Sequence, residues 1–536
     1  MTANTGSSSA LTLDELNEDA RNLAFDAVQS RLPDVWKRMR LNEPGESVVV
    51  VPSVTVDRVV VQGGALTQAM EERFLFLLLL LRQPRLRMIY VTSMPINPSI
   101  IEYYLALLPG VIPSHARARL SLVAVGDSSS SPLTEKLLAR PRLLAQIASL
   151  VPDPLRSHLV PYNTTGLERD LSISLGIPMY GADPRLFPLG TKTGCRRVFS
   201  EAGVHFPAGF EDLRSWADVV RALTELRSQR PDVGEAMVKL NEGVSGKGNA
   251  VVDLRDLPPP GDAREPAELE HRLQRMELED EDITAGAFLG KLQERGGIAE
   301  ELITGEELLS PSVQLRITPV GDIELLSTHD QVLGGPSGQS YLGCVFPADP
   351  AYARTITRDA LLVGKVLAKK GVLGRFAIDF VVVRHRQAWT SYAIEVNLRK
   401  GGTTHPFLTL QFLTDGRYHA DTALFLTPAG RERHLVATDH LEDPSLRGLR
   451  VDDLFDLVAR TGIHFDQARQ TGVVFHMISC LTELGRVGMT AVGESPAAAQ
   501  AVYDRAERIL LQEARASVVP GPLGGPVRAG SSARLT

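Results

Sequence analysis

Between residues 45 and 165, short apolar runs alternate with longer segments in which apolar residues recur with the period of a helix. The short runs predict strands and the longer segments predict helices, with strands at 47–54, 87–93, 120–125 and 158–162 and helices at 68–81, 98–108 and 133–150. This βαβα order predicts an open parallel sheet, and small ligands commonly bind at the carboxyl ends of such strands. The polar loop at 126–131 follows one of these strands, although such loops are more often solvated surface.

A second pair of expected strands, 236–240 and 250–254, flanks a glycine-rich loop. Backbone amides of such a loop can close over an anion without obstruction by side chains. The spacing matches neither a Walker A loop nor a Rossmann fingerprint, and a simple hairpin turn remains the alternative interpretation. The following residues, 256–283, are acidic and interrupted by proline, and they predict a solvated insertion with a helical middle.

Residues 376–383 and 394–402 predict a hairpin that carries polar groups into an otherwise apolar region. Side chains alternate across a strand, so Glu395, Asn397 and Arg399 share one face. A turn centred near residue 387 would place Asp379 opposite Glu395 and Asn397. Two carboxylates and an amide oxygen are ligands that suit Mg²⁺, which is typically shared with the phosphates of a nucleotide.

Near the end of the chain, a helix at 451–460, a buried strand at 472–477 and a long helix at 497–514 predict a small C-terminal unit of mixed α and β structure. The ends of the chain, 1–20 and 516–536, are rich in small and polar residues and predict disordered tails.

Composition narrows the class of protein. A chain of 536 residues with 43% hydrophobic and 23% charged residues has room for about three or four globular units. Its net charge of −7 gives no electrostatic reason to expect nucleic acid or an anionic membrane as a partner. The apolar run at 74–81 is too short to cross a bilayer. Three cysteines far apart in the sequence and a start without a secretory signal favour a reducing cytoplasm.

The order of these motifs resembles the ATP-grasp superfamily of carboxylate ligases: a lysine, a second lysine before a glycine-rich loop, an acidic hinge, and Asp followed by Glu-x-Asn-x-Arg. Three stretches resemble more narrowly the peptide ligases of pheganomycin biosynthesis and its relatives, namely GVSGKGNAVVDL, EVNLRKGGTTHPF and GVVFHMISCLTELGRVG. The resemblance implies an α/β pre-ATP-grasp domain at 21–165, an ATP-grasp domain of two α+β subdomains at 166–415 with 256–283 as the insertion, and a C-terminal domain at 416–515.

The resemblance also implies a role for each candidate residue, with ATP and a pair of Mg²⁺ ions as cofactors. Phosphate binding is expected from Lys192, Lys239, Gly243, Ser245, Gly246, Lys247 and Gly248. Adenine binding is expected from Glu300, Glu301 and Ile303, and ribose binding from Glu307. The metal ligands are Asp379, Glu395 and Asn397. Arg399 would stabilise the acyl phosphate, with Arg316 as a second candidate for that role. Lys400, Gly401, Thr403, Thr404 and His405 would contact the substrate or serve as scaffold.

Three functions remain open at this point. The leading prediction is a ligase that activates an amino-acid-like carboxylate as an acyl phosphate and transfers it to an amine in specialised metabolism. The second is a carboxylate–thiol ligase that loads a carrier protein. The third is a nucleotide sensor without catalysis. The expected partners are small-molecule carboxylates and amines, with the carrier protein under the second alternative and a homodimer as a further option.

Overall fold

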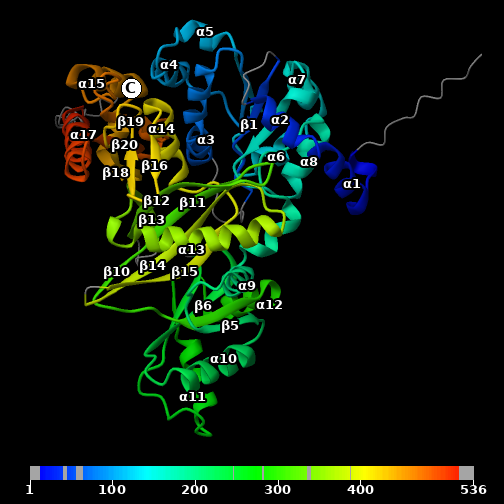
Figure 1. The fold of residues 1–536 in the computed structure, drawn as a ribbon, viewed down its shortest axis with the longest axis vertical. Helices are drawn as coiled ribbons and strands as arrows, with labels where there is room; N and C mark the ends of the chain where they lie inside the picture. Colours follow the sequence, from blue (N-terminus) through cyan, green and yellow to red (C-terminus); the bar gives the residue numbers. More distant parts are fainter. Residues whose placement is uncertain are drawn as a thin grey trace, which may run out of the picture.

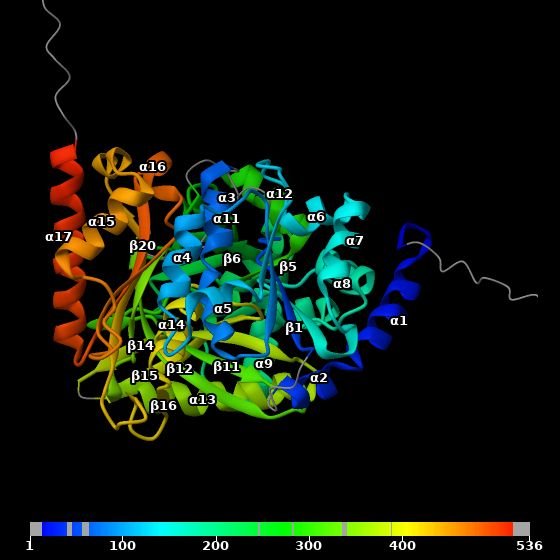
Figure 2. The same cartoon turned by 90° about the horizontal axis from the view of Figure 1, so that it is seen from above.

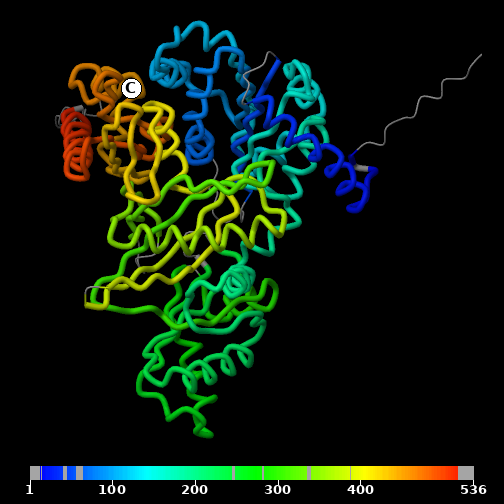
Figure 3. The backbone as a smooth tube through the Cα atoms, viewed as in Figure 1, coloured from blue at the N-terminus to red at the C-terminus, as the bar shows by residue number. Residues whose placement is uncertain are grey.

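The computed structural model describes residues 13–39, 45–55, 64–244, 247–280, 283–334, 340–386 and 388–517. An N-terminal unit and a C-terminal unit lie side by side over a central sheet, and a smaller unit lies beneath that sheet (Figures 1 and 3). Seen from above, the first helix and the last helix lie at opposite edges of the molecule (Figure 2). Within the described residues no helix is long and apolar enough to cross a membrane.

The N-terminal unit contains the predicted parallel sheet, in the order β3-β2-β1-β4. Its strands are β1 (Ser47–Val51), β2 (Arg87–Thr92), β3 (Leu120–Ala124) and β4 (Ser157–Pro161). Every residue of β1 is buried, as expected of a central strand covered on both faces. Its α-helices are α1 (Glu18–Gln29), α2 (Leu32–Met39), α3 (Gly64–Glu72), α4 (Pro98–Ala106), α5 (Pro113–Arg117), α6 (Leu133–Leu138), α7 (Pro141–Leu150) and α8 (Gly166–Leu175).

Three expectations for this unit need correction. The helix expected at 68–81 ends at Glu72, and the apolar run forms a buried 3₁₀ segment, η2 (Leu75–Arg82), which packs against helix α14 (Thr404–Thr414). The helix expected at 133–150 is divided between α6 and α7, because Pro141 cannot donate the backbone hydrogen bond that a continuous helix needs. The first tail was predicted too long, since α1 begins at Glu18; residues 1–12 lie outside the described part.

The unit beneath the central sheet has its own five-stranded sheet, in the order β5-β9-β6-β7-β8. Its strands are β5 (Gly209–Leu213), β6 (Glu235–Val244), β7 (Lys247–Asp253), β8 (Glu277–Leu278) and β9 (Gly297–Glu301). Its helices are α10 (Trp216–Gln229), α11 (Glu265–Gln274) and α12 (Ala285–Arg295).

The helical middle predicted for the segment 256–283 is present as α11, but the segment is not wholly solvated, because one face of α11 packs into the core of this unit. Leu269 and Leu273 lie one helical turn apart on α11 and are fully buried in the same cluster as the apolar face of α10. Arg227 of α10 forms an ion pair with the buried Glu265. The acidic composition of the segment describes its exposed face, whereas its apolar positions fix it to the neighbouring helix.

The central sheet has nine strands, in the order β10-β14-β11-β12-β13-β18-β20-β19 with β15 paired to β14. The strands are β10 (Glu307–Leu309), β11 (Pro311–Ile317), β12 (Ile323–Gly334), β13 (Ser340–Phe346), β14 (Gly374–His385), β15 (Ala388–Asn397), β18 (His434–Glu442), β19 (Gly472–His476) and β20 (Arg486–Gly493); β16 (Arg417–His419) and β17 (Leu424–Leu426) form a separate hairpin. Helices α9 (Lys192–Ala202) and α13 (Pro350–Lys369) share a buried cluster with β11 and β14.

The small C-terminal unit of mixed α and β structure is present as predicted, and its strands continue the central sheet. Strand β13 pairs with β18, and β18 pairs with β20, so one ladder runs from the middle of the chain into its C-terminal part. Helices α15 (Val451–Thr461), α16 (Cys480–Leu484) and α17 (Pro496–Ser517) complete the unit, and α17 lies near the bounds expected for the terminal helix.

Candidate active site

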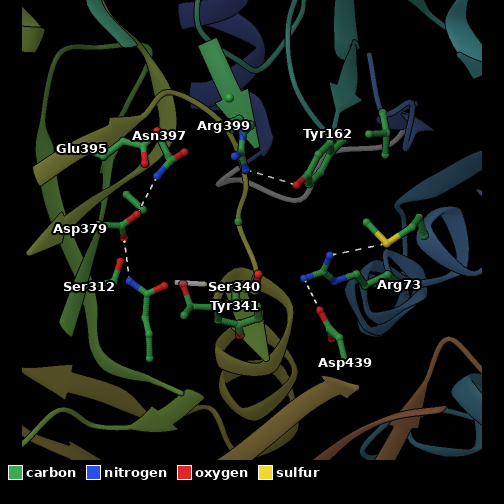
Figure 4. Close-up of a pocket in the computed structure, with 18 of the residues that line it drawn as sticks. Arg73, Tyr162, Ser312, Ser340, Tyr341, Asp379, Glu395, Asn397, Arg399 and Asp439 are labelled. Carbon is green, nitrogen blue, oxygen red and sulfur yellow. Dashed lines mark hydrogen bonds and ion pairs between the residues drawn. The ribbon is translucent and has the colours of Figure 1, made fainter. Parts of the chain in front are cut away.

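A cavity of about 480 Å³ lies where the three units meet. Its wall includes residues of the N-terminal unit, of the central sheet with its C-terminal part, and of the unit beneath that sheet (Figure 4). The predicted site residues that line this cavity are Lys192, Lys239, Gly243, Asp379, Glu395, Asn397, Arg399, Gly401 and Thr403. Most of the predicted phosphate, metal and catalytic residues therefore meet in one place.

The hairpin of β14 and β15 carries the predicted Mg²⁺ ligands and is called the metal hairpin below. Its register pairs Asp379 with Glu395 as predicted. Asp379 of β14 lies opposite Glu395 of β15, and Ala377 lies opposite Asn397. A bulge follows at Ile394, where the pairing shifts by one residue. The Asn397 side-chain amide donates to Asp379 Oδ2 at 2.8 Å, and Gln331 Nε2 donates to Asp379 Oδ1 at 3.1 Å. Strand β15 ends at Asn397, so Arg399 lies two residues beyond the strand and not within it as predicted.

The two carboxylates of the hairpin differ in charge environment. Burial raises the pKa of Asp379 to about 6, and the neighbouring Glu395 adds to the rise. Burial alone would also raise the pKa of Glu395, but Lys192, whose Nζ lies 2.7 Å from Glu395 Oε1, and Arg399 hold it below its usual value. Two carboxylates that repel one another, beside a carboxamide oxygen, fit the oxygen-rich ligand set of Mg²⁺.

Two lysines line the cavity, one from helix α9 and one from strand β6 of the unit beneath. Lys192 begins helix α9, and Lys239 lies on β6 with its Nζ 2.7 Å from Glu300 Oε1. The buried Glu300 also forms an ion pair with Arg196 at 2.9 Å, so two cations share one carboxylate. Burial alone would lower the pKa of Lys192, but Glu395 raises it, so this side chain stays charged at neutral pH. Both ammonium groups are placed where phosphate oxygens could replace or share their carboxylate partners.

The structure does not bring the predicted adenine and ribose residues to the described wall of the cavity. Glu301 accepts a hydrogen bond from the backbone amide of Ala208 at 2.9 Å, and Ile303 follows β9 in a half-buried position. Glu307 pairs with Arg384, which lies opposite it on β14, at 2.7 Å. Their roles in binding nucleotide stay predictions. Of the glycine-rich loop, Gly248 has a φ of +109°, whereas Ser245, Gly246 and the Lys247 side chain lie outside the described part.

The two predicted catalytic arginines lie in different places. Arg399 lines the cavity, where its Nη1 donates to the Tyr162 hydroxyl at 3.4 Å and to the Lys400 carbonyl at 3.3 Å. Arg316 instead donates from Nε to Glu324 at 2.8 Å and lies over the ring of Trp36. Arg316 is thus held against the N-terminal unit, away from the described cavity wall, and the structure does not place it with the other site residues.

The predicted substrate residues are divided between the cavity and its support. Gly401 and Thr403 line the cavity, and the Gln314 side chain donates to the Thr403 hydroxyl. Thr404 accepts from the Gly401 amide at 3.0 Å. Lys400 is buried and donates to the Pro161 carbonyl, which ties this loop to the end of β4. Burial also lowers the pKa of Lys400 to about 7.

Sequence reasoning missed the residues that line the opposite wall, among them Arg73, Tyr162 and Asp439. They lie far apart in the sequence, and no spacing rule connects them. One signal was present: Arg73 directly precedes the apolar run at 74–81, and a charged residue in such a place needs a buried partner. In the polar loop 126–131, Asp127 pairs with Arg140 and Ser131 alone lines the cavity, so the loop is mostly surface.

Comparisons with known proteins agree with this architecture. The family described as IQCH-like, ATP-grasp matches residues 186–285 and 281–421, and the family described as the PGM1 C-terminal domain matches residues 453–506. The chain is 29% identical to L-propargylglycine–L-glutamate ligase of Streptantibioticus cattleyicolor over 89% of this chain and 96% of that protein. It is 24% identical to IQ motif-containing protein H of Danio rerio over 82% of this chain, but it spans only 46% of that longer relative.

Solved structures show the same fold at low sequence identity. A biotin carboxylase from Campylobacter jejuni in complex with an ATP analogue superposes with a TM-score of 0.53 at 13% identity, covering 89% of this chain and 96% of the other. The ADP complex of an N5-carboxyaminoimidazole ribonucleotide synthetase superposes with a TM-score of 0.50 at 11% identity, covering 88% and 98%. The solved structures show the fold, while the family match over residues 186–421 and the likeness to a ligase over most of the chain indicate an ATP-grasp enzyme.

Proposed function

We propose that this enzyme joins the carboxylate of one amino acid to the amine of another, after ATP has converted that carboxylate to an acyl phosphate. The observation that carries the proposal is the position of Arg399, in the wall of a cavity that also holds Asp379, Glu395 and Asn397. A guanidinium beside a magnesium-binding wall can stabilise the negative charge that develops as a phosphoryl group reaches a carboxylate. The likeness to a ligase named for two amino acids supports this class of substrate.

Each group has a separate task in this mechanism. Asp379, Glu395 and Asn397 would hold Mg²⁺, and Lys192 and Lys239 would bind nucleotide phosphates as fixed positive charges. When bound, ATP supplies the γ-phosphoryl group and leaves as ADP. Arg399 needs no proton transfer, because it contributes permanent charge and hydrogen-bond donors to the acyl phosphate and to the oxyanion formed when the amine attacks. Phosphate then leaves as the amide forms.

The proposal is tested by incubating purified protein with ATP, Mg²⁺ and pools of amino acids, and following ADP, phosphate and new amides. ADP and phosphate formed together, and only with an amino-acid pool, are expected. AMP and pyrophosphate would instead show adenylation. Turnover that requires a pantetheine thiol in place of an amine would favour the thiol ligase, and nucleotide binding without turnover in any pool would favour the sensor.

A biosynthetic role is also part of this proposal. The named relative from Streptantibioticus cattleyicolor acts on propargylglycine, which is outside the standard set of amino acids. The amino-acid pools in this test should therefore include amino acids with nonstandard side chains as well as the standard ones. Faster turnover with a nonstandard donor than with any standard amino acid would support a place in specialised metabolism, and the reverse order would count against it.

A further inference from the structure

A buried polar cluster lies beside the cavity, on the side opposite the metal hairpin. It consists of Arg73, His405, Asp439 and His476, which come from the end of α3, from α14, from β18 and from β19. Arg73 Nη2 lies 2.5 Å from Asp439 Oδ2, and Arg73 Nε donates to His405 Nδ1 at 3.2 Å. Asp439 Oδ1 lies 2.7 Å from His476 Nε2 and 3.2 Å from His405 Nε2. The cluster therefore joins the N-terminal unit to the C-terminal part of the central sheet.

The ligand atoms of His405, Asp439 and His476 lie close enough together to hold a metal ion. Arg73 argues against that use, because its fixed positive charge is already in contact with the only carboxylate of the group. A second cation at the same carboxylate would be repelled at short range in a poorly hydrated environment. The histidines and Asp439 are better explained as the support that holds the guanidinium of Arg73.

That support leaves part of the guanidinium facing the cavity. Arg73 is 6% exposed, lines the cavity, and uses Nε and Nη2 within the cluster. Among the described residues the partner of Nη1 is the Met70 sulfur, 3.9 Å away, which is a weak acceptor. In Figure 4 this guanidinium points into the cavity, across from Asp379. A buried guanidinium with an unsatisfied edge toward a cavity matches a carboxylate, which can accept two parallel hydrogen bonds.

The position of Arg73 in the cavity limits which substrate carboxylate it can bind. Under the proposed function, the carboxylate that reacts must lie beside Arg399 and the metal hairpin, and it is consumed when the amide forms. The amino acid that supplies the amine keeps its own carboxylate. We propose that Arg73 binds the free carboxylate of the amine-supplying amino acid, and that Asp439, His405 and His476 are positioning residues for its guanidinium. This inference rests on the proposed function and adds the substrate class: an α-amino acid with an unmodified carboxyl group.

Neighbouring features are consistent with a binding wall built for an anion. Arg486 lines the same wall and donates from Nε to the Asp439 carbonyl at 2.7 Å, and the half-exposed Glu442 pairs with its Nη1 at 2.9 Å. His476 packs directly over Gly488, where an added Cβ would lie 2.2 Å from the imidazole Nε2. Glycine at that position therefore leaves the space that the ring needs in order to reach Asp439.

The test compares acids with amides as acceptors. With a donor found in the ATP assay, each standard amino acid and its α-carboxamide are supplied as amine donor, and kcat/KM is measured by ADP release with the product identified by mass spectrometry. The wild-type enzyme should prefer the acid by about tenfold or more, since a hydrogen-bonded charge is lost in the amide. Arg73→Met should bring the ratio of acid to amide close to one while leaving the KM for ATP within about twofold.

Two further variants separate binding from stability. Asp439→Asn keeps the shape of the cluster and leaves Arg73 in place, so it should raise the KM for the acid acceptor more than it lowers kcat. Arg227→Met is the matched control, because Arg227 is also a buried arginine paired with a buried carboxylate, Glu265, but lies in the unit beneath the sheet. It should lower the thermal midpoint and leave the acid-to-amide ratio unchanged.

The possible results are distinct. Turnover by the wild-type enzyme without preference for acid acceptors would overturn the inference and leave the proposed function intact. A preference that survives Arg73→Met, or one that follows the donor and not the acceptor, would overturn it as well. No turnover in any amino-acid pool would overturn the proposed function and the inference together. If Arg73→Met does not fold, the acid-to-amide ratio of Asp439→Asn decides, and an unchanged ratio rejects the role of the cluster.

Discussion

Replacing Asp379 with asparagine should make the enzyme more stable and inactive at the same time. Burial and Glu395 raise the pKa of this carboxyl from its ordinary 3.8 to about 6, so the ionised form is disfavoured in the folded chain. A difference of about two pKa units corresponds to ~3 kcal/mol at a pH above both values. Asp379 is only half-buried, and solvent screening reduces this figure to a gain on the order of 1–2 kcal/mol for Asp379→Asn.

The sign of this effect depends on pH in a defined way. Because the folded pKa is raised, the penalty is complete above about pH 6, shrinks as the pH falls through the folded pKa, and vanishes below the unfolded value near pH 4. The gain from Asp379→Asn should therefore be largest near pH 8 and about half as large near pH 5. Asn397 can rotate its amide to accept from the new side chain, so the hydrogen bonds of the hairpin can be kept.

Urea unfolding without nucleotide or Mg²⁺ measures this change, and Trp389 on β15 supplies a fluorescent reporter in the hairpin itself. The matched control is Glu395→Gln, whose effect has the opposite sign. Lys192 holds the pKa of Glu395 below its usual value despite burial, so Glu395 stabilises the fold above its unfolded pKa, and this contribution is lost as the pH falls through the folded pKa. Glu395→Gln should therefore destabilise the protein near pH 8 and both variants should lose Mg²⁺-dependent turnover.

If Asp379→Asn unfolds more easily than the wild type near pH 8, or if its stability difference is the same near pH 5, burial does not disfavour the ionised form of Asp379. Either result would mean that the carboxyl of Asp379 is already well solvated or paired. Normal ATP turnover in a folded Asp379→Asn or Glu395→Gln variant would remove the hairpin from the metal site, whatever its stability.

Three other outcomes are expected. Arg399→Lys should lower turnover on the order of 10²-fold and leave nucleotide affinity, measured by titration, nearly unchanged, because a lysine keeps the charge but loses the planar fork; loss of affinity with normal turnover at saturating ATP would assign Arg399 to phosphate binding. Arg316→Lys should leave turnover within about twofold, since Arg316 is held by Glu324 and Trp36, and a large loss would contradict this placement. Lys239→Met should raise the KM for ATP by tenfold or more, and an unchanged KM would show that Lys239 serves only to neutralise Glu300.

The metal hairpin could be predicted from sequence because its information is local. Two apolar strands with one short connection fix the register, and the register alone brings Asp379 opposite Glu395. The parallel sheet of the N-terminal unit was predictable for a similar reason, since alternating strands and helices restrict the topology. The position of Arg399 just past the strand was not predictable, because the pattern of alternation says nothing about where hydrogen bonding to the neighbouring strand stops.

The opposite wall of the cavity depends on contacts that sequence spacing does not encode. Arg73 meets Asp439 across several hundred residues. Arg73 precedes an apolar run and Asp439 lies between Thr438 and His440, and neither context identifies the partner. The pairing of β13 with β18 is equally hidden, since the sequence of a strand does not identify the strand with which it pairs. The acidic segment 256–283 misled prediction because charge was averaged over residues that face water and residues that face α10.

The continuous sheet gives a physical reason for the C-terminal unit to belong to the active site. Asp379 on β14 and Asp439 on β18 are joined by the intervening strands β11, β12 and β13, so one hydrogen-bonded ladder sets the separation between the metal hairpin and the cluster around Arg73. The ladder is tight where the two parts join: an added Cβ at Gly343 of β13 would lie 2.2 Å from the Ala437 carbonyl oxygen of β18. Lys239, by contrast, reaches the cavity from the separate sheet beneath. Asp379 and Asp439, the residue that positions Arg73, are thus fixed within one sheet, whereas Lys239, a predicted phosphate-binding residue, comes from another unit. Changes in nucleotide binding therefore need not alter the choice of acceptor.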